Sequence, residues 1–129
     1  AGENGVHKDQ GNVGEAAAIL YFTKSGAKVS KPLFENTSYD LIVDDGLSLC
    51  RVQVKSTPYL SKYGIYQVEL RTKGGNTSWN GVVKLADSSG CDKLFVYCSN
   101  GDTYLIPVME FDGQGRVSLG IKYESFRVM

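Results

Sequence analysis

Four residues in the first half of the chain have the types and order needed for metal-assisted phosphodiester hydrolysis: Glu15, Asp40, Gln53 and Lys55. This reaction needs a divalent ion that neutralises charge, positions water and assists the leaving oxygen. Mg²⁺ prefers oxygen ligands. Asp40, the amide of Gln53 and the backbone carbonyl of Val54 can supply them, and Glu15 can bind directly or through a metal-bound water. Lys55 can stabilise charge on the phosphate or hold the attacking water.

Three of the four residues also have an ordinary structural explanation. Glu15 follows the start of a predicted helix, where the helix dipole favours an acid. Gln53 and Lys55 alone fit a solvent-facing strand, because a lone Q-x-K is a weak signal. The ordered set, with a hairpin between Asp40 and Gln53, favours the metal site.

A predicted hairpin positions three of the four residues. Two apolar runs, 39–43 and 49–55, flank the turn signal Asp44-Asp45-Gly46. Strand side chains alternate between faces. The second run therefore has a polar face and a core face, formed respectively by Arg51, Gln53 and Lys55 and by Cys50, Val52 and Val54.

The remaining pattern predicts an α/β fold: a single domain with a mixed β-sheet flanked by helices. A helix is expected over 12–22, with Asn12 as N-cap and Gly26 as the stop. Strands are expected over 28–33, 65–71 (in the same sheet), 92–98 and 103–106, with a helical turn over 108–111. Residues 117–129 are weakly patterned.

Length and composition fit one domain. The chain has 129 residues, and we expect a loose tail over 1–10 and a folded domain over 11–129. No apolar run reaches the ~18 residues of a membrane span, and no signal peptide is recognisable. The three cysteines match no zinc spacing. Cys50 and Cys98 fit buried free thiols, which favours the cytoplasm.

Other chemistries fit the sequence poorly. The one histidine, His7, lies in the expected tail, which argues against histidine-based hydrolysis and zinc catalysis. No nucleophile-elbow, Walker A or dinucleotide-binding motif is present.

The charge distribution suggests a nucleic-acid partner although the net charge is zero. Between residues 51 and 84 the only acid is Glu69, against six basic residues: Arg51, Lys55, Lys62, Arg71, Lys73 and Lys84. Such a segment can form one positive face, or simply a solvated surface. Trp79, in the polar loop 72–81, is either a packing anchor or a contact to a sugar or base.

The motifs resemble a known family. Glu15 in NVGEAAAILYF, Asp40 in YDLIV and QVK in RVQVKST resemble the PD-(D/E)XK nuclease superfamily, including Holliday junction resolvases. The later blocks VELRTKGGNTSWNG, CDKLFVYCSNGDTYLIPV and IKYESFRV resemble group I intron-associated homing endonucleases and their phage relatives. The likeness covers nearly all of the chain after Gly11. Two positions depart from the superfamily pattern: Gln53 replaces the usual Glu or Asp, and Tyr39 replaces the proline.

The resemblance implies a PD-(D/E)XK-type core and a site-specific, homing-type double-strand DNA endonuclease that uses Mg²⁺, with Mn²⁺ as the alternative. Cutting both strands implies a homo-oligomer, a dimer or tetramer. Five residues are then candidates for DNA contact: Arg71, Lys73, Asn76, Trp79 and Asn80. The alternatives are a Holliday junction resolvase and a catalytically inactive DNA-binding module.

Overall fold

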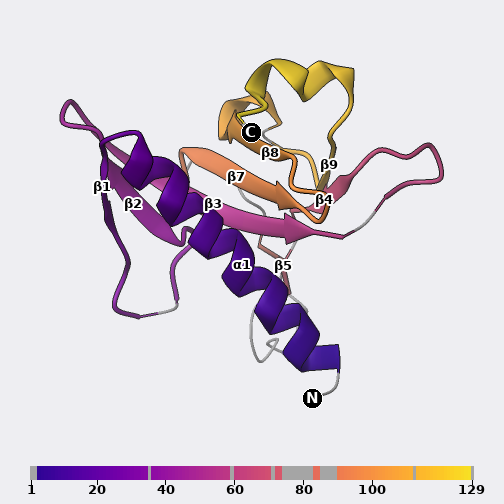
Figure 1. Cartoon of the computed structure of the whole chain (residues 1–129), viewed down its shortest axis with the longest axis horizontal. Helices are drawn as coiled ribbons and strands as arrows, with labels where there is room; N and C mark the ends of the chain where they lie inside the picture. Colours follow the sequence, from indigo (N-terminus) through magenta and orange to yellow (C-terminus); the bar gives the residue numbers. More distant parts are fainter. Residues whose placement is uncertain are drawn as a thin grey trace.

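A five-stranded mixed sheet forms the centre of the computed structural model, which describes residues 3–34, 36–58, 60–70, 72–73, 83–84, 90–111 and 113–128. The strand order is β1-β2-β3-β7-β8 (Figure 1). The strands are β1 (Lys28–Ser30), β2 (Leu41–Asp44), β3 (Leu49–Thr57), β7 (Lys93–Cys98) and β8 (Thr103–Pro107). β3 and β7 are parallel, and the other neighbouring pairs are antiparallel. The predicted mixed α/β sheet is confirmed.

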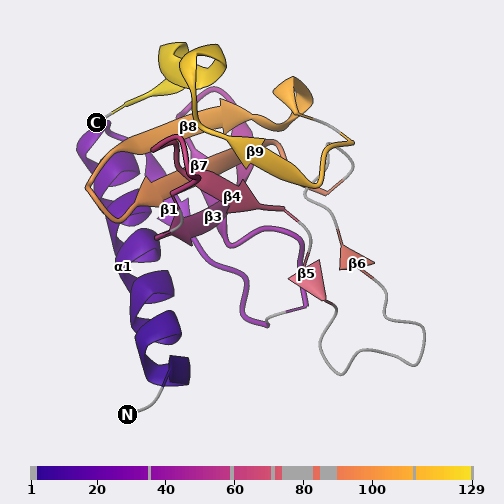
Figure 2. The ribbon, with the colours of Figure 1, turned by 90° about the vertical axis from the view of Figure 1, so that its right-hand side faces the viewer.

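The helix α1 (Glu3–Lys24) crosses one face of this sheet (Figures 1 and 2). It begins well before the predicted N-cap Asn12, so residues 3–10, expected to form a loose tail, are helical. Its end is as predicted. Gly26 has φ +91°, and the N–H of Ala27 donates to the carbonyl of Phe22 at 3.1 Å. Glycine adopts this left-handed conformation without steric cost.

The predicted hairpin is present. β2 and β3 pair with Leu41 opposite Val52 and Asp44 opposite Leu49. In the turn between them Gly46 has φ +92°, and Asp45 accepts hydrogen bonds from the N–H groups of Leu47 and Ser48 at 2.8 and 2.9 Å. The turn therefore contains its own local hydrogen bonds.

The sheet has a hydrophobic cluster on each face. The cluster beneath α1 confirms the predicted core face of β3, because Val52 is buried there and Cys50 and Val54 pack against it. Its buried members are Ala18, Phe22, Leu41, Val43, Val52 and Phe95. The opposite cluster lies under the C-terminal segment and includes Leu94, Val96, Ile106, Val117 and Tyr123. Strand alternation explains this division, since Leu94 and Phe95 are neighbours that face opposite clusters.

One prediction about the second face was wrong. β4 (Gln67–Glu69), expected in the main sheet, pairs instead with β9 (Arg116–Ser118) in a separate ribbon on the side away from α1 (Figure 2). The alternation around Val68 correctly indicates a strand, but it does not specify the partner. The weakly patterned end of the chain supplies both β9 and a 3₁₀ helix, η2 (Ile121–Phe126), with Tyr123 only 3% exposed.

Three smaller features complete the fold. A short 3₁₀ helix, η1 (Val108–Glu110), forms at the predicted helical turn. β5 (Thr72–Lys73) pairs with β6 (Val83–Lys84). All three cysteines are free, with Cys91 and Cys98 buried and Cys50 half-buried. In the described part of the chain, no helix has the length and apolar character needed to span a bilayer.

Candidate active site

Asp40 is fixed against β3 by two backbone hydrogen bonds. Its N–H donates to the carbonyl of Val52 at 2.9 Å, and its carboxylate oxygen Oδ2 accepts from the N–H of Val54 at 2.7 Å. Leu41, the next residue, pairs with Val52, so Asp40 lies at the end of the β2–β3 ladder. Val54, which donates to its carboxylate, stands between Gln53 and Lys55 on β3, and the charge of Lys55 acts on the Asp40 carboxyl. Asp40 is therefore held beside the stretch of β3 that carries Gln53 and Lys55.

Gln53 carries the most informative atom of the site. Its Oε1 is the one buried side-chain nitrogen or oxygen atom without a hydrogen-bond partner in the described part of the chain. A buried amide oxygen without a donor costs free energy, so this atom is suited to accept from a ligand or coordinate a cation.

Lys55 lies one strand period beyond Gln53 and is half-buried. Burial lowers the pKa of its ammonium below the usual 10.5, although the negative charges of Asp40 and Glu69 act in the opposite direction. A partly desolvated ammonium close to Asp40 can interact more strongly with an anion than an exposed lysine can.

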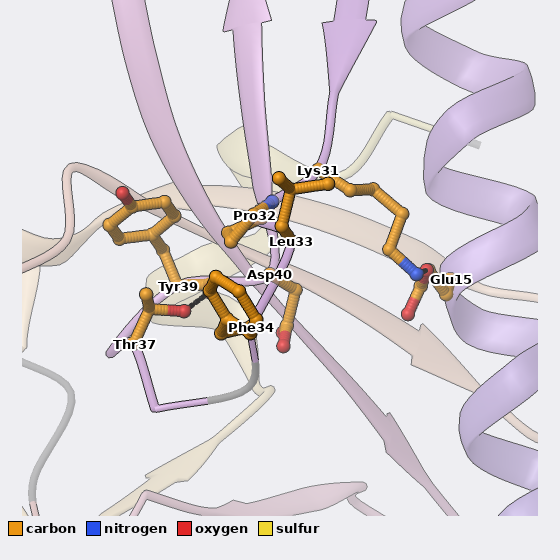
Figure 3. Close-up of a pocket in the computed structure, with 8 residues that line it drawn as sticks. All are labelled: Glu15, Lys31, Pro32, Leu33, Phe34, Thr37, Tyr39 and Asp40. Atoms are coloured by element: carbon orange, nitrogen blue, oxygen red, sulfur yellow. Dashed lines mark hydrogen bonds and ion pairs between the residues drawn. The ribbon is translucent and has the colours of Figure 1, made fainter.

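Glu15 projects from α1 towards the loop between β1 and β2 (Figure 3), where it forms an ion pair with Lys31. Glu15 and Asp40 line one pocket of about 380 Å³. Its other lining residues belong to that loop and its flanks: Lys31, Pro32, Leu33, Phe34, Thr37 and Tyr39. The structure therefore brings together the two predicted acids, which are 25 positions apart in the sequence.

Gly14 brings this part of α1 close to β3. A Cβ atom at Gly14 would lie 2.1 Å from Oγ of Ser56, whose hydroxyl donates to the carbonyl of Gln10 at 2.9 Å. No larger residue fits here without displacing the helix or the serine. The close approach determines how far Glu15, the next residue, lies from the sheet.

The electrostatics of the pocket favour a cation near Asp40. Burial is the main effect that raises the pKa of Asp40, and the like charge of Glu15 raises it further. The hydrogen bond from Val54 and the positive charges of Lys55 and Lys31 oppose this rise. A partly buried carboxylate beside a second acid gains more from a bound cation than an isolated surface acid does.

The donor set fits a hard divalent ion. Among the described residues, no group of three or more His, Cys, Asp or Glu side chains could hold a metal. The available donors are instead the carboxylates of Asp40 and Glu15 and the unpartnered amide oxygen of Gln53. Oxygen-only donors suit Mg²⁺, which retains several waters, whereas zinc sites use nitrogen and sulfur. The role of the Val54 carbonyl as a further ligand stays a prediction.

The predicted DNA-contact residues fall mainly outside the described part of the chain. Arg71, Asn76, Trp79 and Asn80 lie outside it, and the structure describes only the backbone of Lys73, in β5. Sequence reasoning missed Lys31 and Phe34, which line the pocket. The segment after β1 carries no motif, and only the fold brings it beside α1.

Comparisons with known proteins identify the family of this chain. A model of the PD-(D/E)XK endonuclease family matches residues 6–127. The chain is also similar to a solved bacterial homing endonuclease, I-Ssp6803I, with a TM-score of 0.80 and 30% sequence identity over 93% of this chain and 87% of that one. No curated protein matches the chain in sequence. The family match covers nearly the whole chain and includes all four candidate residues, so the chain belongs to the PD-(D/E)XK endonuclease family.

Proposed function

We propose that this nuclease is a site-specific, homing-type double-strand DNA endonuclease that depends on Mg²⁺, with Mn²⁺ as the alternative ion. The observation that carries the proposal is the unpartnered buried oxygen of Gln53, next to the residue whose N–H holds the carboxylate of Asp40. PD-(D/E)XK nucleases generally use divalent metals. The site offers oxygen donors for such an ion and a lysine beside them.

Asp40, Gln53 and Glu15 would hold the ion, with the Val54 carbonyl as a further ligand. When bound, the ion would lower the pKa of water and neutralise charge on the phosphate. The hydrogen bond from Val54 leaves the second carboxylate oxygen of Asp40 for this role. Without the ion, Lys31 neutralises Glu15.

Lys55 would act on the phosphate or on the attacking water. Its position two residues after Gln53 on one strand face allows its ammonium to reach a group held at Asp40. A fixed positive charge at this place stabilises the negative charge that develops in the transition state.

Double-strand cleavage would require two copies of this site. We infer a homo-oligomer, a dimer or tetramer, whose two-fold axis matches a palindromic or near-palindromic target. Arg71, Lys73, Asn76, Trp79 and Asn80 remain the candidates for contact with DNA phosphates and bases.

A catalytically inactive DNA-binding module is the second candidate, because neutral Gln53 gives the site one charge fewer than a Glu would. One experiment separates the two: wild type and Asp40→Asn are incubated with a random-sequence duplex library and with a four-way junction, in Mg²⁺ and in EDTA. The endonuclease proposal predicts duplex cleavage only by wild type with Mg²⁺. Binding without cleavage in every condition would favour the inactive module, and preferential cutting of the junction would indicate a resolvase.

A further inference from the structure

Two large apolar side chains stand exposed at the rim of the candidate active site. Leu33 is 91% exposed and Phe34 is 76% exposed, and both line the pocket that contains Glu15 and Asp40 (Figure 3). Scattered exposed apolar residues are common on protein surfaces. An adjacent pair beside reactive groups is more informative, because exposed apolar patches mark binding surfaces.

The loop that carries this pair is anchored at its ends. Pro32, with its fixed φ, follows Lys31, which pairs with Glu15 on α1. At the other end, the hydroxyl of Ser38 donates to the carbonyl of Gly90 at 2.9 Å, and Tyr39 packs against the core. Leu33 and Phe34 lie between these anchors and bury little of their own surface. The fold therefore does not explain why they are apolar.

We propose that Leu33 and Phe34 pack against the nucleobases of the duplex next to the cleaved phosphate, with the Phe34 ring stacked on an unstacked or tilted base. The inference rests on the proposed function, because Asp40 must then lie at the scissile phosphate. The rim of the same pocket faces the adjoining sugar and bases. Apolar side chains inserted at a base step can unstack it and kink the duplex.

The groups beside the pair favour DNA over a protein partner. The pocket rim combines the apolar pair with Lys31, and the pocket contains the two carboxylates that would hold the metal ion at the phosphate in the proposed function. Protein interfaces deplete charged residues at their centre. Surfaces that bind nucleic acids instead place aromatic rings beside cations, the rings against bases and the cations against phosphates.

The test uses a duplex that wild type cuts, recovered from a random-sequence library in Mg²⁺. 2-Aminopurine, which fluoresces more strongly when unstacked, replaces a base on either side of the cut position. Fluorescence and DNA affinity are measured in EDTA, and single-turnover cleavage is measured in Mg²⁺. The variants are Phe34→Ala and Leu33→Ala. The control is Leu47→Ala, since Leu47 is 95% exposed and lies in the turn at the opposite end of β2 from Asp40.

We expect wild type to increase the fluorescence beside the cut position, and Phe34→Ala to abolish that increase and weaken cleavage by about tenfold, because stacking on one base contributes ~1–3 kcal/mol. Leu33→Ala should reduce both signals, and Leu47→Ala should change neither. Normal fluorescence and cleavage with Phe34→Ala would overturn the base contact while leaving the endonuclease intact. If wild type cuts no duplex in the library, the result overturns the proposed function, and the base contact, which rests on it, is overturned as well.

A second measurement tests the other possible occupant, a second copy of this chain. Sedimentation without DNA compares the oligomeric state of wild type, Phe34→Ala and Leu47→Ala. The proposal predicts the same state for all three. A change confined to Phe34→Ala would assign the pair to a protein interface and overturn the base contact.

Discussion

The carboxylate of Asp40 accepts a 2.7 Å hydrogen bond from the backbone N–H of Val54. Val54 lies between Gln53 and Lys55 on β3, so this contact fixes the acid relative to both neighbours. Because the donor is backbone, the contact survives any change of side chain at position 54 except proline. The geometry of the candidate site therefore depends on the pairing of β2 with β3.

Replacement of Gln53 by glutamate should strengthen metal binding. The unpartnered Oε1 already lies in a buried position, and a carboxylate there would add a charge to the donor set. We expect roughly tenfold tighter Mg²⁺ binding, since ligand charge count tunes affinity for hard cations. Isothermal titration of Mg²⁺ into DNA-free protein measures this.

The same substitution should destabilise the metal-free protein, because a third acid joins Glu15 and Asp40. Gln114→Glu, at an exposed position, controls for the change in net charge. Equal Mg²⁺ affinity in wild type and Gln53→Glu would exclude position 53 from the metal site.

Asp40→Asn should raise the stability of the metal-free protein at neutral pH. Burial, aided by the charge of Glu15, raises the pKa of Asp40 above 3.8 in the folded state. Folding therefore favours the protonated form of Asp40, so ionisation of this acid lowers the free energy of unfolding. The loss grows as the pH rises from 3.8 through the pKa of the folded state and is constant at higher pH. Asparagine removes this loss and retains an oxygen that can accept from Val54.

Urea unfolding in EDTA at several pH values measures the effect. The advantage of Asp40→Asn should be largest at neutral pH and vanish below pH 3.8, where the acid is protonated in both states. A variant that is less stable than wild type at neutral pH would show that the charged carboxylate stabilises the fold.

Gly14→Ala should destabilise the protein, because the new Cβ would meet Oγ of Ser56 at 2.1 Å. We expect a loss of ~1–3 kcal/mol in the free energy of unfolding, typical of overpacking. Gly11→Ala is the matched control on the same helix, since beyond the adjoining helix backbone no atom lies within 4 Å of the Cβ that it would add. That variant should gain ~0.5–1 kcal/mol through helix propensity. Chemical denaturation of the two variants and wild type measures both changes.

A double variant identifies the cause. In the Ser56→Ala background the hydroxyl that meets the new Cβ is absent, so Gly14→Ala should cost less there. An equal cost in both backgrounds would place the strain elsewhere along the helix.

The elements that carry the site could be predicted because their signals are local. The turn Asp44-Asp45-Gly46 and the alternation of Cys50, Val52 and Val54 specify a hairpin without reference to the rest of the chain. Gly26 marks the end of α1 for the same reason. The predicted start of α1 at Asn12 was wrong. Asparagine is also tolerated inside a helix, and residues 3–10 contain no apolar stripe that would indicate a helix there.

Long-range placement could not be predicted in the same way. β4 has the alternation of a strand, yet its partner β9 lies in a segment with little pattern. Lys31 and Phe34 reach the pocket only through the path of the β1–β2 loop. The close contact of Gly14 with Ser56 also depends on how the helix packs on the sheet, and no spacing in the sequence encodes it.

The central claim is that Lys55 acts with the metal-binding residues to cleave DNA, and Lys55→Ala tests it most directly. The measurement is single-turnover cleavage of a duplex that wild type cuts, in Mg²⁺ and in EDTA, together with DNA affinity and thermal unfolding. Lys24→Ala, exposed in the last turn of α1, is the matched control. We predict that Lys55→Ala loses about 10²–10³-fold in rate, as for removal of one group that stabilises transition-state charge, with its fold and much of its DNA affinity retained. Cleavage by Lys55→Ala at the wild-type rate would contradict the account.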